Sequence, residues 1–173
     1  AKTGQSEFIV HPPTGKWLIA GGIKLFGYNE FGWRFSAALV GSISIALMYF
    51  TAKALFNKPF LSAFAASLIL LDGLHLVHSR VALLDIFLLL FIRIAVLAFL
   101  HHKYWITSIA LGLAISTKWS GLYLLIALAL LALLLDYRKF KFLGSSNSLR
   151  NVIESKLALR FLQFGVLPIV TYI

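Results

Sequence analysis

Polar and charged side chains flank the apolar segments of this chain, and their types suit the binding of an anion. Eight of them form one group: His11, Lys16, Arg34, Asp72, His75, His78, Arg80 and Lys118. Four of the eight are fixed cations, and Lys and Arg bind phosphate through charge-assisted hydrogen bonds. The group therefore favours recognition of an anionic headgroup, such as a lipid phosphate.

Each of these residues also has a structural explanation. Lys16 and Lys24 could anchor an interfacial helix to headgroups, and Arg34 could snorkel to the surface from the end of a span. His75 and His78 lie three residues apart, but a hydrogen-bonded polar histidine is commoner than a metal ligand.

Two further charges fall inside the apolar run of residues 81–100. Asp85 lies about one turn inside this run, where a carboxylate paired with a surface cation is the ordinary interpretation. Arg93 lies deeper. Although an intramembrane charge is functional by default, its place toward the cytoplasmic end leads us to interpret it as structural or snorkelling.

Metal chemistry is not indicated by the sequence. The chain has no cysteine, which excludes disulfides and thiolate metal sites, and its five histidines follow no HExxH or zinc-finger pattern. The sequence assigns no certain cofactor, and a divalent metal is left open.

The elements that position these residues are predicted to be membrane helices. Of the 173 residues, 60% are hydrophobic and 13% are charged, whereas soluble domains are about half apolar and about a quarter charged. The length allows roughly five or six spans of ~20 residues. The net charge of +10 is divided among short loops and forms no basic face with interleaved aromatic residues, so we predict no nucleic-acid partner.

We therefore predict an all-α fold, a polytopic transmembrane helical bundle with an interfacial amphipathic helix at residues 14–26. The chain would be one domain over residues 1–173. Residues 1–32 would be an external loop carrying the interfacial helix, and residues 33–135 would hold five membrane helices. These would cover residues 33–56, 59–72, 81–100, 104–117 and 120–135. Residues 136–159 would be a cytoplasmic loop, and residues 160–173 would begin a further membrane helix.

The loop charges predict the orientation. If the connections alternate sides, then Lys53, Lys58, the segment HHK and the long basic loop share one side, which the positive-inside rule makes cytoplasmic. The segments HPPTGK, GWR, DGLHLVHSR and TKWSG then share the other side. We expect an integral membrane protein with its active face external or luminal.

Four motifs in order resemble one known family. HPPTGKW, GWRFSAALVG, LLDGLHLVHSRVALLDIF and STKWSGLY resemble the dolichyl-phosphate-mannose protein O-mannosyltransferases, especially bacterial members, over about residues 8–136. These are phospholipid carrier-dependent glycosyltransferases of the GT-C fold. The resemblance implies transfer of mannose, with inversion, from a polyprenyl-phosphate-mannose donor to Ser or Thr hydroxyls of a protein acceptor. It places the enzyme in the plasma membrane if bacterial, or in the endoplasmic reticulum membrane if eukaryotic.

The resemblance also implies roles for individual residues. The donor phosphate would be bound by His11, Lys16, Arg34 and Arg80. Asp72 would be a second acidic position of the catalytic site, and Lys118 and Trp119 would line the cavity. The family has an apolar residue where this chain has Thr14, and its acidic pair lies upstream of HPPxGK, in a region that this chain lacks.

Both ends of the sequence look cut, so we expect a piece of a longer protein that is inactive alone. Two other functions fit the same sequence. One is a related transferase that uses a lipid-linked sugar and a non-protein acceptor. The other is a fragment of a membrane transporter, whose charges would line a pathway.

Overall fold

The computed structural model describes residues 11–143 and 156–172, and this part of the chain consists of helices and short connections. The helices are α1 (Thr14–Phe26), α2 (Glu30–Phe56), α3 (Pro59–Leu71), α4 (Gly73–Val81), α5 (Leu84–Leu100), α6 (Tyr104–Ile115) and α7 (Gly121–Leu143). A last helix covers residues 156–172, in which the π-helical turn η1 (Leu162–Val166) precedes α9 (Leu167–Tyr172). The predicted all-α fold is confirmed.

Helix lengths bear on how the chain meets a membrane. By length and composition α2 is long and apolar enough to span, and so is the segment Gly121–Arg138 of α7. The pair α3 and α4, bent by 60° at Asp72, makes a third candidate if it counts as one span. At about 1.5 Å per residue, the 12-residue α6 is much shorter than a bilayer core of ~30 Å. The five membrane helices therefore stay a prediction.

Helix ends follow from local sequence. The Asn29 side chain caps α2 by accepting a hydrogen bond from Gly32 N at 2.8 Å. Asp72 ends α3 and caps α4, because its carboxylate accepts hydrogen bonds from the backbone N–H groups of Leu74 and His75. Gly27, with φ of 85°, makes the turn between α1 and α2.

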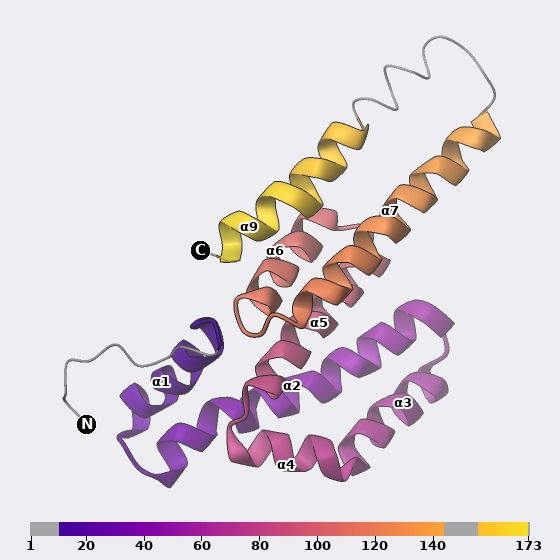
Figure 1. Ribbon diagram of the computed structural model, residues 1–173. Coiled ribbons are helices and arrows are strands. Elements are labelled where there is room, and N and C mark those ends of the chain that lie inside the picture. Colours follow the sequence, from indigo (N-terminus) through magenta and orange to yellow (C-terminus); the bar gives the residue numbers. More distant parts are fainter. Residues whose placement is uncertain (1–10, 144–155, 173) are drawn as a thin grey trace.

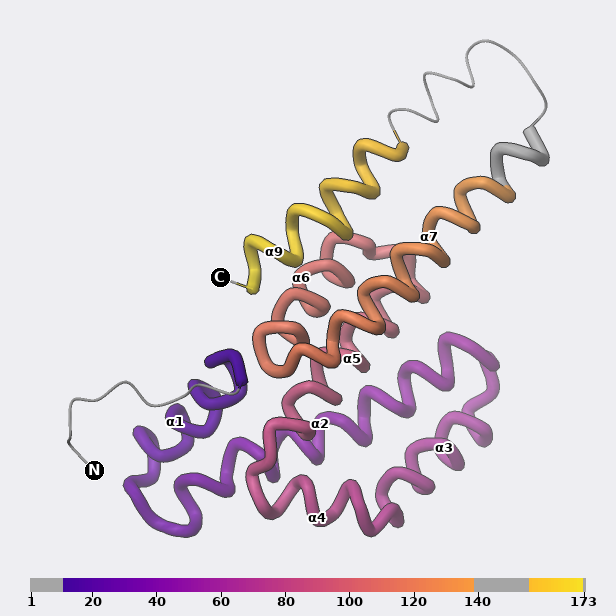
Figure 2. Tube along the Cα trace, viewed as in Figure 1, coloured from indigo at the N-terminus to yellow at the C-terminus, as the bar shows by residue number. Residues whose placement is uncertain are grey.

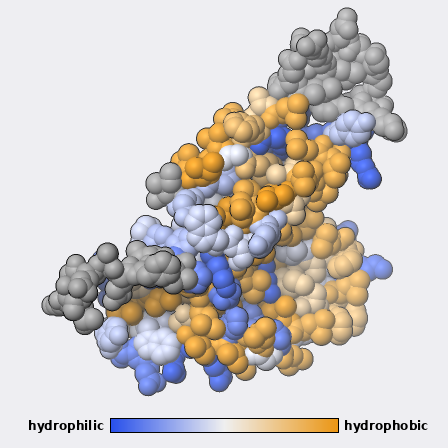
Figure 3. Space-filling model, viewed as in Figure 1, coloured by the Kyte–Doolittle hydropathy of each residue, from blue (hydrophilic) through white to orange (hydrophobic). Residues whose placement is uncertain are grey.

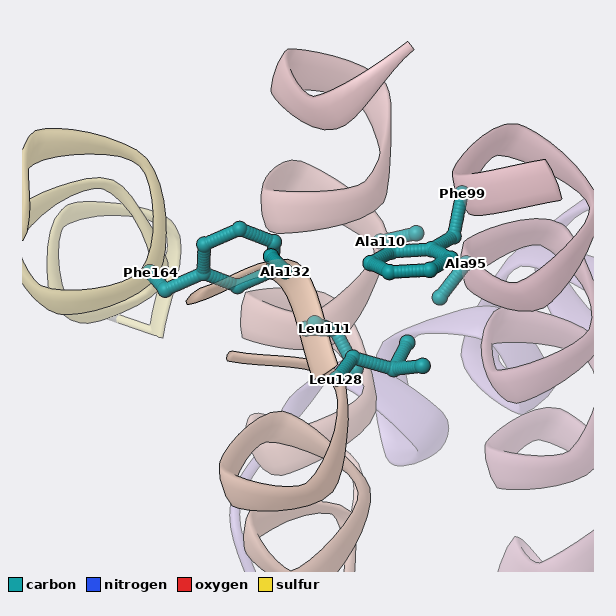
Figure 4. Close-up of a cluster of buried hydrophobic side chains, with 7 residues drawn as sticks. All are labelled: Ala95, Phe99, Ala110, Leu111, Leu128, Ala132 and Phe164. Atoms are coloured by element: carbon teal, nitrogen blue, oxygen red, sulfur yellow. The ribbon is translucent and has the colours of Figure 1, made fainter. Parts of the chain in front are cut away.

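The helices form two groups that meet at α5. Helix α1 folds back on α2, and α3 and α4 return along α2, while α6, α7 and α9 pack beyond α5 (Figures 1 and 2). Helix α5 contacts both groups. The C-terminal half of α5 contributes Ala95 and Phe99 to a buried cluster with residues of α6, α7 and η1 (Figure 4). Hydrophobic side chains cover most of the visible surface, and hydrophilic ones gather toward α1 and the start of α2 (Figure 3).

Two segments differ from the prediction. The polar stretch after Asp72 was expected as a connection, but residues 73–81 form α4, since the Asp72 cap lets a helix begin there. Of the loop expected at residues 136–159, residues 136–143 belong to α7 and residues 156–159 belong to the last helix. The helical parts of both segments contain polar residues, and the sequence prediction took these residues as a sign of irregular structure. Residues 144–155, which include Arg150, lie outside the described residues.

Candidate functional site

Two of the predicted motifs meet through the backbone. Thr14 N, in HPPTGK, donates to the carbonyl oxygen of Ser116 at 3.1 Å, and the hydroxyls of the same two residues lie 2.6 Å apart. Gly15 is buried against the start of α5 and the turn before α7. A Cβ at Gly15 would lie 2.7 Å from Leu84 Cδ2 and 3.1 Å from Thr117 Cγ2. The starts of α1 and α5 and the turn before α7 therefore form one end of the bundle.

An ion pair joins two of these segments. Lys118 Nζ donates to Asp85 Oδ1 at 2.7 Å, and both side chains are partly exposed, by 32% and 40%. The expected pairing of Asp85 with a cation is confirmed, and the partner comes from TKWSG. The role of Lys118 as a residue that lines the donor cavity stays a prediction.

Trp119 lies on another surface. It lines an apolar hollow between α6, α7 and α9, where its ring lies 5.6 Å from the ring of Tyr172. Its indole is 58% exposed, so it is available to lipid or to further protein.

A cavity of about 410 Å³ lies between the α3–α4 bend and α5. Its polar lining comprises Asp72, His75, His78, Asp85 and Arg93, and the rest is Ile and Leu. Asp72, predicted as an acidic position of the site, thus lines a cavity together with a second carboxylate.

The two most buried polar residues of this lining have structural contacts. His75 Nε2 lies 3.1 Å from the carbonyl oxygen of Gly41, and its Nδ1 is buried without a hydrogen-bond partner. The Arg93 guanidinium is buried and donates to the carbonyl oxygen of Ser44 at 2.6 Å, which confirms a structural role and excludes snorkelling. The expectation of a satisfied His75 is met at one ring nitrogen only.

The four predicted phosphate ligands are not part of that lining. Lys16 and Arg80 are exposed, on the first turn of α1 and the last turn of α4, and His11 is half-buried. The Arg34 side chain is 49% exposed, 3.6 Å from Glu30 and stacked 4.6 Å from the centre of the Trp33 ring. Their convergence on one phosphate stays a prediction.

Sequence reasoning missed one polar cluster at the other end of the bundle. Arg160 donates through Nε and NH2 to both Asp136 oxygens, at 2.7 and 3.2 Å, and through NH1 to Gln163. Its guanidinium also stacks 3.8 Å from the centre of the Tyr104 ring. The sequence places Asp136 in the loop predicted at residues 136–159, whereas the structure places it in α7. The sequence does carry a signal for this helix: Asp136 lies eight residues after Leu128, so it continues the helical spacing of the apolar residues before it.

No three His, Asp or Glu side chains in the described part of the chain are grouped to hold a metal ion. No residues in the described part of the chain are assigned to the divalent metal that the sequence left open.

The helical fold, with its two or three candidate membrane spans and a cavity lined by two carboxylates, defines the class of helical membrane proteins. The profile described as dolichyl-phosphate-mannose-protein mannosyltransferase matches residues 28–173, and the chain belongs to this family.

Bacterial and yeast proteins are among the curated relatives. The polyprenol-phosphate-mannose–protein mannosyltransferases of Mycolicibacterium smegmatis and Mycobacterium tuberculosis are each 34% identical, over 95% and 91% of this chain. Dolichyl-phosphate-mannose–protein mannosyltransferase 1 of Saccharomyces cerevisiae is 29% identical over 86% of the chain and 22% of its own length. The chain spans 38% and 37% of the two bacterial relatives. No solved structure matches the chain.

Proposed function

We propose that the protein containing this chain transfers mannose from a polyprenyl- or dolichyl-phosphate-mannose donor to Ser or Thr hydroxyls of proteins. The observation that carries the proposal is the junction of HPPTGK, the start of α5 and TKWSG, built by the Thr14–Ser116 and Asp85–Lys118 contacts. The names of the family and of its relatives give the donor and the acceptor class.

The chemistry follows from charge. An acceptor hydroxyl attacks the anomeric carbon and loses its proton to a base, while the bond between that carbon and the phosphate oxygen breaks. Negative charge grows on the departing lipid phosphate, and cations already fixed beside it stabilise this growth more than they stabilise the ground state. Lys16, Arg34 and Arg80 are the cations proposed for this role, with His11 as a further phosphate contact.

The base is proposed to lie in a part of the protein outside this chain. Asp72 already accepts two backbone hydrogen bonds as the cap of α4, which fixes its carboxylate at the rim of the cavity. We assign it a secondary acidic role, in contact with the substrate and not as the principal base.

The active face is proposed to be external or luminal, and the membrane to be the plasma membrane or the endoplasmic reticulum. Cysteine substitutions test this directly, because the chain contains no cysteine. We expect a cysteine at Ser120 to react with an impermeant reagent from outside a sealed vesicle and one at Lys103 to react from the inside. Reaction of both from the same face contradicts the topology.

The decisive experiment is a transfer assay with the full-length protein in proteoliposomes. The donor is radiolabelled polyprenyl-phosphate-mannose, and the acceptor is a Ser/Thr-rich peptide compared with its Ala-substituted control. We expect label only in the hydroxyl-bearing peptide. Movement of the donor lipid across the bilayer without transfer supports the transporter, and transfer to a glycan or lipid supports the related transferase.

A further inference from the structure

The cavity beside the α3–α4 bend has a polar wall that the phosphate-binding cations do not explain. It is lined by Asp72 and Asp85, by His75 and His78, and by the buried Arg93. Its volume of about 410 Å³ falls within the range of ~300–1,000 Å³ that is usual for small-molecule sites. A ligand for it must match carboxylates, imidazoles and a guanidinium together with an apolar wall.

His75 gives the sharpest constraint on that ligand. Its side chain is buried with 7% exposure, and the neighbour of its Nε2 is the carbonyl oxygen of Gly41, which can only accept a hydrogen bond. The neutral ring therefore carries its hydrogen on Nε2, which leaves Nδ1 as an acceptor. Because this Nδ1 is buried and has no partner, a ligand that donates a hydrogen bond would relieve an unfavourable group.

We propose that this cavity holds the hexose of the lipid-phosphate donor, with His75 as a contact that selects the sugar. Sugar hydroxyls donate to carboxylates and to a bare ring nitrogen, and they also accept from a guanidinium such as that of Arg93. The apolar lining of Ile69, Leu74, Ile86, Leu88, Leu89 and Ile92 suits the C–H faces of the ring. A hydrocarbon chain would leave the buried Nδ1 of His75 without a hydrogen-bond donor. This inference rests on the proposed function and adds the position of the sugar.

The position is consistent with that of the proposed phosphate ligands. None of the four proposed phosphate ligands, His11, Lys16, Arg34 and Arg80, lines the cavity. The lysine and the two arginines are exposed. The sugar would then lie in the cavity of mixed polar and apolar lining, and the phosphate would lie outside it among exposed cations. Asp72, at the rim and fixed by its helix cap, would contact the sugar.

The test compares two lipids on the purified full-length protein: polyprenyl-phosphate-mannose and sugar-free polyprenyl phosphate. Leu89→Trp fills the cavity from its apolar wall and leaves the His75–Gly41 contact in place. Leu97→Trp is the matched control, since Leu97 lies on the same helix, is partly buried like Leu89 and lines a separate hollow with Phe50 and His101. Leu89→Phe is a smaller filling, in case the larger one unfolds the protein.

We expect Leu89→Trp to raise the dissociation constant for the mannosyl lipid by about tenfold or more, the discrimination usual for a misfitted pocket. Loss of one hydrogen bond in His75→Phe should raise it by about three- to tenfold. Binding of the sugar-free lipid should stay within about twofold in every variant, and Leu97→Trp should change neither lipid.

Equal weakening of both lipids by Leu89→Trp or Leu89→Phe, or no weakening of either, overturns the sugar assignment. Failure of the proposed function is distinct from this result. In that case the unmodified protein transfers no mannose and does not bind the mannosyl lipid.

Discussion

Lys118 Nζ lies 2.7 Å from Asp85 Oδ1, and this contact ties the turn before α7 to the first turn of α5. Asp85 is well placed for a carboxylate, because the amino end of a helix carries partial positive charge. The Thr14–Ser116 bonds lie two residues away along the same turn. The turn before α7 is therefore held to α5 by the ion pair and to HPPTGK by the Thr14–Ser116 bonds.

The first prediction concerns this pair. Because both side chains are partly exposed, we expect Asp85→Asn and Lys118→Met each to lower the unfolding free energy by only about 0.5–1 kcal/mol. The double variant should cost no more than either single one, since both remove the same interaction. Chemical unfolding of the full-length protein in detergent measures this cycle. Strictly additive losses would show that the two groups are not coupled in solution.

The second prediction uses two adjacent glycines of α1. A Cβ at Gly22 would meet the carbonyl oxygen of Gly32 and lie 2.8 Å from Ser36 Oγ, whereas a Cβ at Gly21 meets nothing within 4 Å. We expect Gly22→Ala to force α1 away from α2 and to lower stability by about 1–3 kcal/mol. Gly21→Ala should be neutral or slightly stabilising, because Ala favours helix by up to ~1 kcal/mol.

Thermal unfolding of the two alanine variants in the same detergent checks this pair. The midpoint should fall for Gly22→Ala only. Equal midpoints would mean that the close approach of α1 and α2 is absent in the protein.

The third prediction concerns the buried Arg160 at the opposite end. Removing a buried charge from its partner usually costs about 3–5 kcal/mol, so Arg160→Met should strongly destabilise the packing of the last helix on α7. Arg160→Lys should rescue little, because an ammonium cannot make the forked contact to both Asp136 oxygens and also reach Gln163. Arg138→Met is the control, since Arg138 is exposed on α7. Limited proteolysis and thermal unfolding should distinguish the variants, and a stable Arg160→Met would contradict the role of the cluster.

The sequence predicted the helices that have strong hydropathy or clear end signals. The helix predicted at residues 59–72 is α3 (Pro59–Leu71), so its start is confirmed and its end differs by one residue. The sequence prediction failed where polarity was taken as a sign of irregular structure. Residues 73–81 are helical despite two histidines and an arginine, because the Asp72 side chain caps the first turn.

Site residues were predictable by type but not by partner. The sequence identified Lys118 and a surface pairing for Asp85, yet 33 residues separate the two, so only the fold brings them together. The same holds for Asp136 and Arg160, which are 24 residues apart. The bare Nδ1 of His75 could not be foreseen either, because it depends on the carbonyl of Gly41 in a neighbouring helix.

The fourth prediction tests the phosphate ligands. Lys16 and Lys24 are both exposed on α1, but only Lys16 lies in HPPTGK at the end that contacts Ser116 and Thr117. If Lys16 faces the donor phosphate, Lys16→Ala should lower the turnover number about 10²–10³-fold, as expected for one removed electrostatic contact to the transition state. Lys24→Ala, which removes the same charge from the same helix, should stay close to the unmodified enzyme.

Arg34 should behave like Lys16, with one distinguishing feature. Its guanidinium stacks on Trp33 and lies 3.6 Å from Glu30, so its position is already partly fixed. Arg34→Ala should lower turnover, and Arg34→Lys should restore little of it if the planar group binds two phosphate oxygens. Glu30→Gln keeps the arginine and removes only an exposed partner, so it should change turnover little. The measurement is steady-state mannose transfer by the full-length protein at saturating donor. Full activity of Arg34→Ala, or an equal loss in Lys24→Ala, would remove these two residues from the phosphate site.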